Sequence, residues 1–375
     1  MKKFPFITSV LFLGFLMSCK FNDVKLLHAT NSLIFTQGRV SEIEKLSVDF
    51  AYPGVSFEIK VKAKSVSAVL MDVGGSAHNH FNVLVDGAVV KTIEVSNKKE
   101  SYLLVDDLDD ATFHTIQLFK RTESFVGVTR FFGFELTGFV ATAKVDVPNK
   151  KLLIIGDSFS CGYGNDVEFT ADQNPETGFH AKNENNYKAY GAIAARELNY
   201  QYQCIAYSGR GMYRNFNLSK TNTLPDIFPL IFPDKAESKQ WDMKNYIPDV
   251  IVIKLGTNDF FGESRSPIQV VDSAAYVTAY LNFVTYLKEL FPKAQVVCVV
   301  GGMMSDSWPA GRNNLTTMRN YVVTVIEKAN TEAKSEKCHY LEFPQHQNVY
   351  GEDWHPTASW HLNYAELLID KVKSL

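Results

Sequence analysis

Ser158 stands at a position where a serine can act as a nucleophile. It follows the apolar run 152–155 in the segment Gly156-Asp157-Ser158. Such a run is typical of a strand buried on both faces of a parallel sheet. A serine just after it lies at the carboxyl edge of the sheet, where the amide groups and dipole of a following helix can stabilise an oxyanion. The same serine could also be only the N-cap of that helix.

Two further blocks follow predicted strands in the same way. The run 250–253 leads into Gly256-Thr257-Asn258-Asp259, and the side-chain amide of Asn258 can donate to a developing negative charge. The weaker run 202–207 leads into Ser208-Gly209-Arg210-Gly211, where glycine lets a backbone N–H approach a ligand closely. Turn formation alone would also explain both blocks.

His355 could supply the base that a catalytic serine needs. It lies in Gly351-Glu352-Asp353-Trp354-His355-Pro356, after the predicted strand 340–343, and Pro356 suits the first turn of a following helix. A serine hydroxyl is a poor nucleophile until a neighbouring base takes its proton. A histidine before a C-terminal helix is often structural, but this one follows a strand that would flank the site. The sequence therefore predicts nucleophilic catalysis by Ser158 with His355 as base.

In the order serine, glycine, asparagine, histidine, these blocks resemble the SGNH (GDSL-type) hydrolase superfamily. The resemblance implies a serine esterase in which Ser158 is the nucleophile and His355 is the base. It also implies an oxyanion hole formed by the backbone of Ser158 and Gly209 and by the side chain of Asn258. Neither a metal nor an organic cofactor is implied.

The group behind His355 departs from the superfamily pattern. The aspartate of the family lies three residues before the histidine, where this chain has Glu352, and Asp353 lies two before. Either carboxylate could fix the tautomer of the imidazole by accepting a hydrogen bond. A backbone carbonyl could do the same and would leave a Ser-His dyad. Asp353 is our preferred third catalytic residue.

The wider sequence resembles carbohydrate esterase family 2, in which a β-sandwich precedes an SGNH domain. The matching segments are Cys161-Gly162-Tyr163-Gly164-Asn165, His114-Thr115 leading to Lys120-Arg121-Thr122-Glu123, Ser208-Gly209-Arg210-Gly211 followed by Arg214-Asn215, and Asp353-Trp354-His355-Pro356. The resemblance implies an acetylxylan esterase-like enzyme that removes O-acetyl groups from plant-type polysaccharides or oligosaccharides. The alternatives are another SGNH esterase or lipase-like activity, and a non-catalytic glycan-binding surface lipoprotein.

Some residues allow two interpretations. Trp354, beside the base, could stack on a sugar ring or could brace the histidine loop. Lys120, Arg121 and Glu123 are as consistent with a structural ion pair near the domain junction as with a binding site.

Residues 28–142 predict an all-β, jelly-roll-like sandwich domain. Apolar and polar residues alternate through 55–62, as in a strand with one wet face. Asp86-Gly87 lies between two apolar runs and predicts a hairpin. Several short strands without a helical period favour a sandwich.

Residues 148–375 predict the α/β SGNH-hydrolase domain. Apolar runs such as 296–300 alternate with helical stretches, which we place at 187–198, 274–290, 314–333 and 358–372. This alternation predicts a parallel sheet with helices on both faces. In such sheets ligands bind beyond the carboxyl ends of the strands, which is where Ser158, Gly209, Asn258 and His355 are expected.

The first nineteen residues have the pattern of an export signal. Lys2 and Lys3 precede the apolar stretch 4–17, which is too short to span a bilayer. The stretch ends in Leu16-Met17-Ser18-Cys19, which resembles the lipobox of bacterial lipoproteins and implies a lipid anchor on Cys19. A plain secretory signal is the alternative. We expect export in either case, as a lipoprotein of the periplasm or cell surface or as a secreted protein.

The net charge limits the class of binding partner, and the positions of the cysteines indicate the state of their thiols. The formal charge is −3, from 38 basic and 41 acidic residues, so the chain lacks the basic excess of a nucleic-acid-binding protein. An acetylated polysaccharide or oligosaccharide suits this balance better than a polyanion. The remaining cysteines, Cys161, Cys204, Cys298 and Cys338, lie in or beside apolar runs, which predicts buried free thiols. The oligomeric state stays open.

Overall fold

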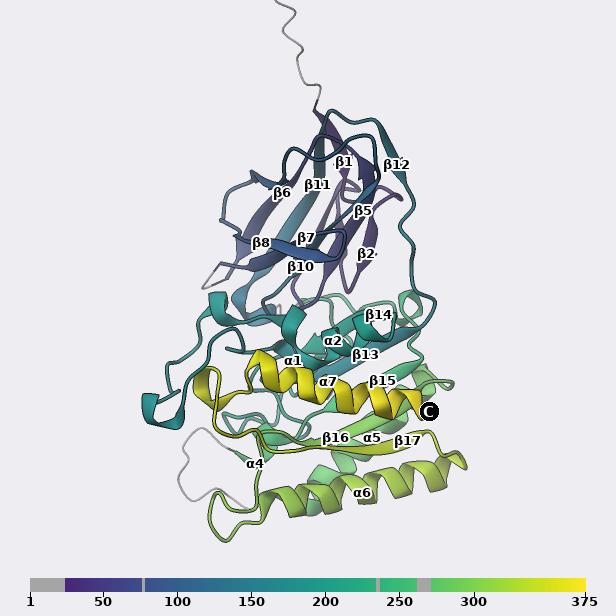
Figure 1. Ribbon diagram of the computed structural model, residues 1–375. Coiled ribbons are helices and arrows are strands. Elements are labelled where there is room, and N and C mark those ends of the chain that lie inside the picture. Colours follow the sequence, from purple (N-terminus) through teal and green to yellow (C-terminus); the bar gives the residue numbers. More distant parts are fainter. Residues whose placement is uncertain (1–23, 76–77, 234–236, 262–270) are drawn as a thin grey trace, which may run out of the picture.

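The structure, a computed structural model, describes residues 24–75, 78–233, 237–261 and 271–375 (Figure 1). Cys19 and the rest of the predicted leader lie outside these residues. An all-β unit runs from β1 (Lys25–His28) to β12 (Ala141–Ala143), and an α/β unit follows from β13 (Lys151–Gly156). The two predicted classes of domain are confirmed, and the first strand begins before the predicted start at residue 28.

The all-β unit consists of two antiparallel sheets packed face to face. One has the strand order β3-β4-β11-β6-β9 with β1 on β11, and the other has the order β12-β5-β10-β7-β8 with β2 on β5. The remaining bounds are β2 (Phe35–Gln37), β3 (Ser41–Ile43), β4 (Ser47–Phe50), β5 (Ser56–Lys62), β6 (Ser65–Gly74), β7 (His80–Val85), β8 (Ala88–Glu94), β9 (Glu100–Val105), β10 (His114–Lys120) and β11 (Val128–Thr137).

Local sequence explains both the hairpin and the core of this sandwich. Asp86 and Gly87 join β7 to β8 with φ angles of 50° and 83°, a conformation that glycine and aspartate tolerate. Phe57 on β5 contacts Phe131 on β11 with ring centroids 4.3 Å apart, and both side chains are fully buried. The apolar positions of the alternating strands therefore meet between the two sheets.

The α/β unit is a five-stranded parallel sheet with the order β14-β13-β15-β16-β17. Its other strands are β14 (Gln201–Ala206), β15 (Val250–Lys254), β16 (Gln295–Gly301) and β17 (Cys338–Phe343). Its helices are α1 (Ser158–Cys161), α2 (Tyr190–Glu197), α3 (Leu224–Ile227), α4 (Thr257–Phe260), α5 (Ser273–Leu290), α6 (Asn314–Ala333) and α7 (Ala358–Lys373). The four helical stretches that we predicted correspond to α2, α5, α6 and α7.

Helices cover both faces of the sheet, and the alternation of side chains along each strand explains how (Figure 1). Leu152 and Ile154 of β13 belong to the core that includes α2 and α7, whereas Leu153 and Ile155 belong to the core that includes α5 and α6. Both faces of β13 are buried, which is why its sequence is continuously apolar. Cys161, Cys204, Cys298 and Cys338 are buried and free, as predicted. Within the described ranges, every helix is too short or too polar to cross a membrane.

The sandwich and the α/β unit share a buried junction. Arg39 of the sandwich is 1% exposed and donates to the carbonyl oxygens of Phe228 and Leu230, the second at 2.9 Å. The hydroxyl of Tyr52 lies 3.3 Å from the carbonyl oxygens of Ile227 and Leu230. These bonds satisfy backbone carbonyls that burial would otherwise leave without a donor.

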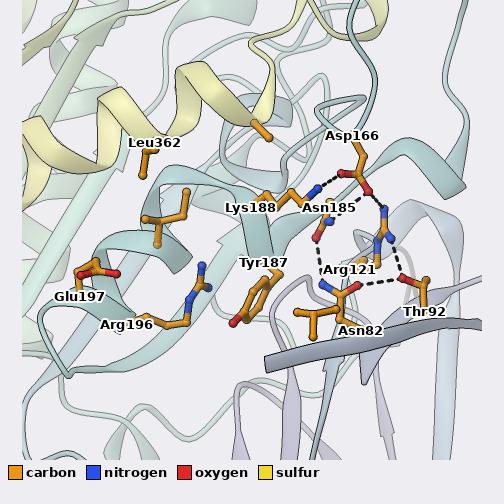
Figure 2. A pocket seen from close by; sticks show the side chains of 13 residues that line it. Asn82, Thr92, Arg121, Asp166, Asn185, Tyr187, Lys188, Arg196, Glu197 and Leu362 are labelled. Atoms are coloured by element: carbon orange, nitrogen blue, oxygen red, sulfur yellow. Dashed lines mark hydrogen bonds and ion pairs between the residues drawn. The ribbon is translucent and has the colours of Figure 1, made fainter. Parts of the chain in front are cut away.

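Arg121 forms a second set of contacts across the junction (Figure 2). Its Nη2 donates to Asp166 Oδ2 at 2.6 Å and to the Lys182 carbonyl, and its Nε donates to the Glu184 carbonyl. The pocket in Figure 2 lies beside this network, and none of its lining residues belongs to the predicted catalytic site. Because Arg121 reaches carbonyls as well as a carboxylate, it fixes a segment of the α/β unit to the sandwich.

We expect Arg121→Met to lower the free energy of unfolding by about 2–4 kcal/mol, because it removes the cation paired with Asp166 and takes a buried donor from the Lys182 and Glu184 carbonyls. Lys188→Met is the matched control, since Lys188 bonds to the same carboxylate but its side chain is 50% exposed. The control should cost less than about 1 kcal/mol. Urea denaturation of the three proteins measures both values, and equal losses would contradict this account of the junction.

Candidate active site

The nucleophile candidate lies at the end of β13 and begins α1. The carboxylate of Asp157 caps this short helix by accepting a hydrogen bond from the N–H of Phe159 at 3.1 Å. Ser158 Oγ lies 2.8 Å from His355 Nε2, although the two residues are 197 positions apart in the chain. The structure thus brings together the serine and the histidine that the sequence predicts as nucleophile and base.

The second nitrogen of the imidazole determines which tautomer is present. His355 Nδ1 lies 3.0 Å from the backbone carbonyl oxygen of Glu352. A carbonyl oxygen can only accept a hydrogen bond, so Nδ1 must carry the proton. Nε2 of the neutral ring is then an acceptor directed at the Ser158 hydroxyl, which is the arrangement that general-base catalysis requires.

No hydrogen bond joins the carboxylate of Asp353 to the imidazole among the described residues, which is at odds with our preferred choice of third residue. The carboxylate accepts hydrogen bonds from the hydroxyl of Tyr163 and from the N–H of Gly178. Asp353 and Trp354 have φ angles of 50° and 64° within the 3₁₀ turn η6 (Glu352–Trp354). These two left-handed residues reverse the chain, so the Glu352 carbonyl faces the ring and the Asp353 side chain does not.

The side chain of Glu352 anchors the histidine loop from behind. It is 1% exposed, and its carboxylate accepts from the N–H of His180 at 3.0 Å, from His180 Nδ1 at 2.6 Å and from Asn183 Nδ2 at 2.7 Å. Gly164 packs directly on this residue, with φ +55° and no room for a Cβ, which would lie 2.4 Å from Glu352 Cβ. The segment after the nucleophile and the histidine loop therefore fix one another.

The environment of His355 favours its neutral form. Burial lowers the pKa of His355 to about 4, against the opposing effects of the Glu352 carbonyl and of the nearby charge on Asp353. The ring of Tyr163 stacks on the imidazole, with centroids 4.3 Å apart and an angle of 24° between the planes. At neutral pH the base is consequently unprotonated and held in a single orientation.

Two backbone amides are available beside the serine. For the N–H groups of Ser158 and Gly209, no acceptor occurs among the residues that the structure describes. Gly209 is the third residue of a turn in which the N–H of Arg210 donates to the Tyr207 carbonyl at 3.3 Å. Its φ of 76° matches the third position of a type II turn, which strongly favours glycine. Unpaired amides at this edge are suited to bind an oxyanion.

Asn258 contacts both segments that carry these amides. It is 8% exposed on α4, and its Nδ2 donates to the Arg210 carbonyl at 2.8 Å and lies 3.4 Å from Asp157 Oδ2. Because the contact with Asp157 is long, one hydrogen of the amide group is only weakly engaged. The structure therefore places Ser158, Gly209 and Asn258 at one end of the sheet, with His355.

Two buried ionisable residues support this edge, of which sequence reasoning missed Lys254 and considered Asp259 only as a turn residue. Lys254, at the end of β15, is fully buried and its Nζ donates to Thr257 Oγ1 at 3.2 Å. Asp259 is also fully buried, and its carboxylate accepts from the N–H groups of Met212, Tyr213 and Arg214, which fixes the loop after Gly209. A charged residue ending an apolar strand was the available signal for Lys254.

Two tryptophans lie on loops that follow the carboxyl ends of strands. Trp354 is half-buried, its Nε1 donates to Glu176 Oε1 at 3.2 Å, and its ring meets Tyr350 edge to face. Trp308, which sequence reasoning missed, is 54% exposed and stacks on Phe261, the residue after α4. Loop aromatics follow no periodic pattern, so only the structure shows that one of them is exposed.

Both domains match models of known protein families. The model described as Carbohydrate esterase 2 N-terminal matches residues 36–143, and that of the GDSL-like Lipase/Acylhydrolase family matches residues 154–365. The cellulase/esterase CelE of Acetivibrio thermocellus is 32% identical over 346 residues, which are 92% of this chain and 40% of that protein. This chain thus spans less than half of that relative.

Two further relatives match over nearly their whole length. An acetylxylan esterase / glucomannan deacetylase of Cellvibrio japonicus is 26% identical over 96% of this chain and 95% of its own. A solved family two carbohydrate esterase from Clostridium thermocellum, in complex with cellohexaose, superposes with a TM-score of 0.79 at 31% identity, over 91% of this chain and 98% of that one. The sandwich, the hydrolase sheet and the sequence all match those of family 2 carbohydrate esterases. The chain belongs to carbohydrate esterase family 2.

Proposed function

We propose that this chain is a carbohydrate acetyl esterase that removes O-acetyl groups from plant-type polysaccharides or oligosaccharides. The observation that carries the proposal is the 2.8 Å contact between Ser158 Oγ and a neutral His355, beside the unpaired amides of Ser158 and Gly209. The names of two relatives support the substrate class: one is an acetylxylan esterase / glucomannan deacetylase, and the other was solved with cellohexaose.

The proposed reaction proceeds through an acyl-enzyme. Ser158 Oγ attacks the acetyl carbonyl carbon while its proton passes to His355 Nε2. The tetrahedral oxyanion is stabilised by the N–H groups of Ser158 and Gly209 and by Asn258 Nδ2. His355 then protonates the sugar oxygen as the C–O bond breaks, which leaves an acetyl group on Ser158. Water, deprotonated by His355, attacks this ester in the same way and releases acetate.

A dyad with a backbone carbonyl is enough for this cycle. When His355 becomes an imidazolium, the Glu352 carbonyl still accepts from Nδ1–H and stabilises the positive ring through its dipole. The charge of Asp353 acts on the imidazole from a distance by raising its pKa, without a hydrogen bond between the two side chains. Trp354 and the exposed Trp308 are our candidates for stacking on sugar rings beside the scissile ester.

Ser158→Ala should reduce hydrolysis of p-nitrophenyl acetate, and acetate release from acetylated xylan, by at least ~10³-fold, because it removes the nucleophile. Ser359→Ala is the matched control, since Ser359 is an exposed serine in the first turn of α7. The control should keep the wild-type rate. Serine-independent hydrolysis at the wild-type rate would refute the proposed function.

The lowered pKa of His355 predicts an unusual pH profile. A depressed histidine pKa means that the base stays neutral until the pH falls to about 4, whereas an ordinary histidine would protonate near pH 6.5. We therefore expect kcat/KM for p-nitrophenyl acetate to be flat from about pH 5 to 8 and to fall with a midpoint near pH 4. Circular dichroism at each pH checks that the protein stays folded. An acid limb centred near pH 6.5 would contradict the neutral, buried base.

The variant Asp353→Asn tests whether Ser158 and His355 act as a dyad or as a triad with Asp353. Asparagine can still accept from Gly178 N–H and can pair with the Tyr163 hydroxyl, so we expect kcat to fall less than about 10-fold. Loss of a true triad carboxylate would cost ~10⁴-fold in kcat, because the imidazole would adopt the wrong tautomer. Tyr163→Phe, which removes the hydroxyl bonded to Asp353, is the companion variant. A loss of kcat near 10⁴-fold in Asp353→Asn would contradict the dyad and support a triad with Asp353.

A further inference from the structure

Glu123 extends from the sandwich to the edge of the hydrolase sheet. It lies between β10 and the 3₁₀ turn η1 (Ser124–Val126), and its side chain is fully buried. Its carboxylate accepts a hydrogen bond from the N–H of Ser208 at 2.7 Å and a second, short bond from the hydroxyl of Ser208. The sequence left an ion pair and a binding site as equal alternatives for this residue, and in the structure both carboxylate oxygens are bound to a serine of the other domain.

The position of Ser208 makes these bonds important for Gly209. Ser208 and Gly209 are the central residues of the turn that begins at Tyr207, and the peptide between them carries the free N–H of Gly209. Type I and type II turns differ mainly in the orientation of this central peptide, which is rotated by roughly 150–180° between them. Two bonds that hold both the backbone and the side chain of Ser208 favour the orientation observed.

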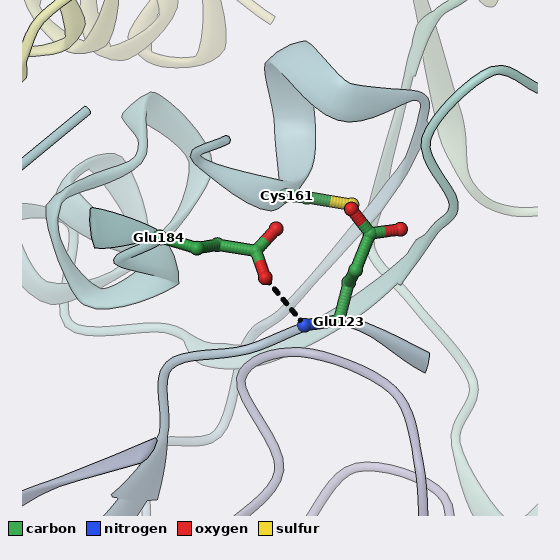
Figure 3. A group of neighbouring side chains, drawn as sticks. All are labelled: Glu123, Cys161 and Glu184. Atoms are coloured by element: carbon green, nitrogen blue, oxygen red, sulfur yellow. Dashed lines mark hydrogen bonds between the residues drawn. The ribbon is translucent and has the colours of Figure 1, made fainter. Parts of the chain in front are cut away.

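The same carboxylate also contacts the helix of the nucleophile (Figure 3). The thiol sulfur of Cys161, on α1 and three residues after Ser158, lies within 4.8 Å of a carboxylate oxygen of Glu123. Cys161 and Glu123 are both fully buried. One sandwich side chain is therefore in contact with the two segments that present the free amides, α1 and the turn at Gly209.

We propose that Glu123 is a positioning residue for the oxyanion hole, by which the sandwich domain fixes the Gly209 amide relative to the Ser158 amide. The inference rests on the proposed esterase function and assigns part of its transition-state stabilisation to the other domain. A second contact of the same loop agrees with it, because Phe125 meets Phe179 edge to face and Phe179 packs at a tilt on Tyr163, the ring that covers His355.

The surroundings of Glu123 explain how a buried carboxylate is tolerated there. Glu184 is fully buried beside it, and Glu184 Oε2 accepts from the N–H of Glu123 at 2.9 Å (Figure 3). Burial, followed by the charge of Glu123, raises the pKa of Glu184 well above its usual value. Burial also raises the pKa of Glu123, and the positive charge of Lys120, buried nearby, opposes the negative charge of the pair.

Hydrogen bonds within the protein account for the Glu123 carboxylate of this cluster. Glu123, Cys161 and Glu184 offer ligand atoms within 4.8 Å of one another. Both oxygens of Glu123 already accept from Ser208, and the lysine Nζ of Lys120 donates to the carbonyl oxygens of Thr122 and Glu123 at 2.6 and 3.2 Å. This hydrogen bonding makes the cluster a structural connection between the sandwich and the active site.

Steady-state kinetics of Glu123→Ala, Glu123→Gln and Ser208→Ala test the inference. We expect Glu123→Ala to lower kcat by about 10–100-fold and to leave KM within about 3-fold, because an oxyanion donor acts on the transition state. Glu123→Gln should recover much of the rate, since its amide oxygen can still accept from Ser208 N–H. Ser208→Ala, which loses only the hydroxyl bond, should lower kcat by about 3–10-fold. Affinity for phenylboronic acid, which forms a tetrahedral adduct with serine, should fall in parallel.

Tyr52→Phe is the matched control for a structural role alone. It removes a hydroxyl that reaches two carbonyl oxygens elsewhere on the same junction, so it should lower Tm and leave kcat unchanged. A folded Glu123→Ala with wild-type kcat, or with a changed KM only, overturns the inference. If that variant does not fold, a wild-type kcat in Ser208→Ala overturns it. An active wild type distinguishes these outcomes from a failure of the proposed function, because a wild type without esterase activity rejects both.

Discussion

The arrangement of the proposed catalytic pair depends on one hydrogen bond, from His355 Nδ1 to the backbone carbonyl of Glu352. It fixes the proton on Nδ1 and leaves Nε2 as the acceptor that faces Ser158, so the tautomer is set by the main chain. A carbonyl brings no charge with it, and a buried imidazole without a bonded carboxylate is harder to protonate. Burial lowers the pKa of His355, and among the described residues no carboxylate bonded to the ring offsets that effect.

A backbone carbonyl can hold the base only if its loop is rigid. The Glu352 carboxylate supplies that rigidity through three donors on the segment 180–183, and Gly164 allows the nucleophile segment to pack directly on it. In a triad, a carboxylate would orient the histidine itself. Here a carboxylate orients the loop, and the loop orients the histidine. The acidic residue that the superfamily pattern marks three before the histidine is thus still engaged, one step further from the chemistry.

Much of the site could be predicted because it lies where strands end. Ser158, Gly209, Asn258 and His355 each follow an apolar run, and parallel strands bring such positions to one edge. The role of Asp353 could not be predicted, because it depends on two consecutive left-handed residues, which leave no pattern in the composition of the loop. The partner of Glu123 could not be predicted for another reason: Ser208 is 85 residues away and in the other domain, and no periodicity relates them. Local patterns identify strands and their ends, but they do not identify pairs across a junction.

The buried, neutral base has a consequence for the surroundings in which the proposed reaction would run. Each acetyl ester that is hydrolysed yields one molecule of acetic acid, so a confined volume of substrate becomes more acidic as deacetylation advances. A histidine that titrated near neutrality would lose its function as its own product accumulated. Because burial lowers the pKa of His355 to about 4, the base keeps its lone pair through most of that change. Desolvation of one ring, achieved by packing alone, would thereby make the proposed reaction tolerant of the acid that it generates.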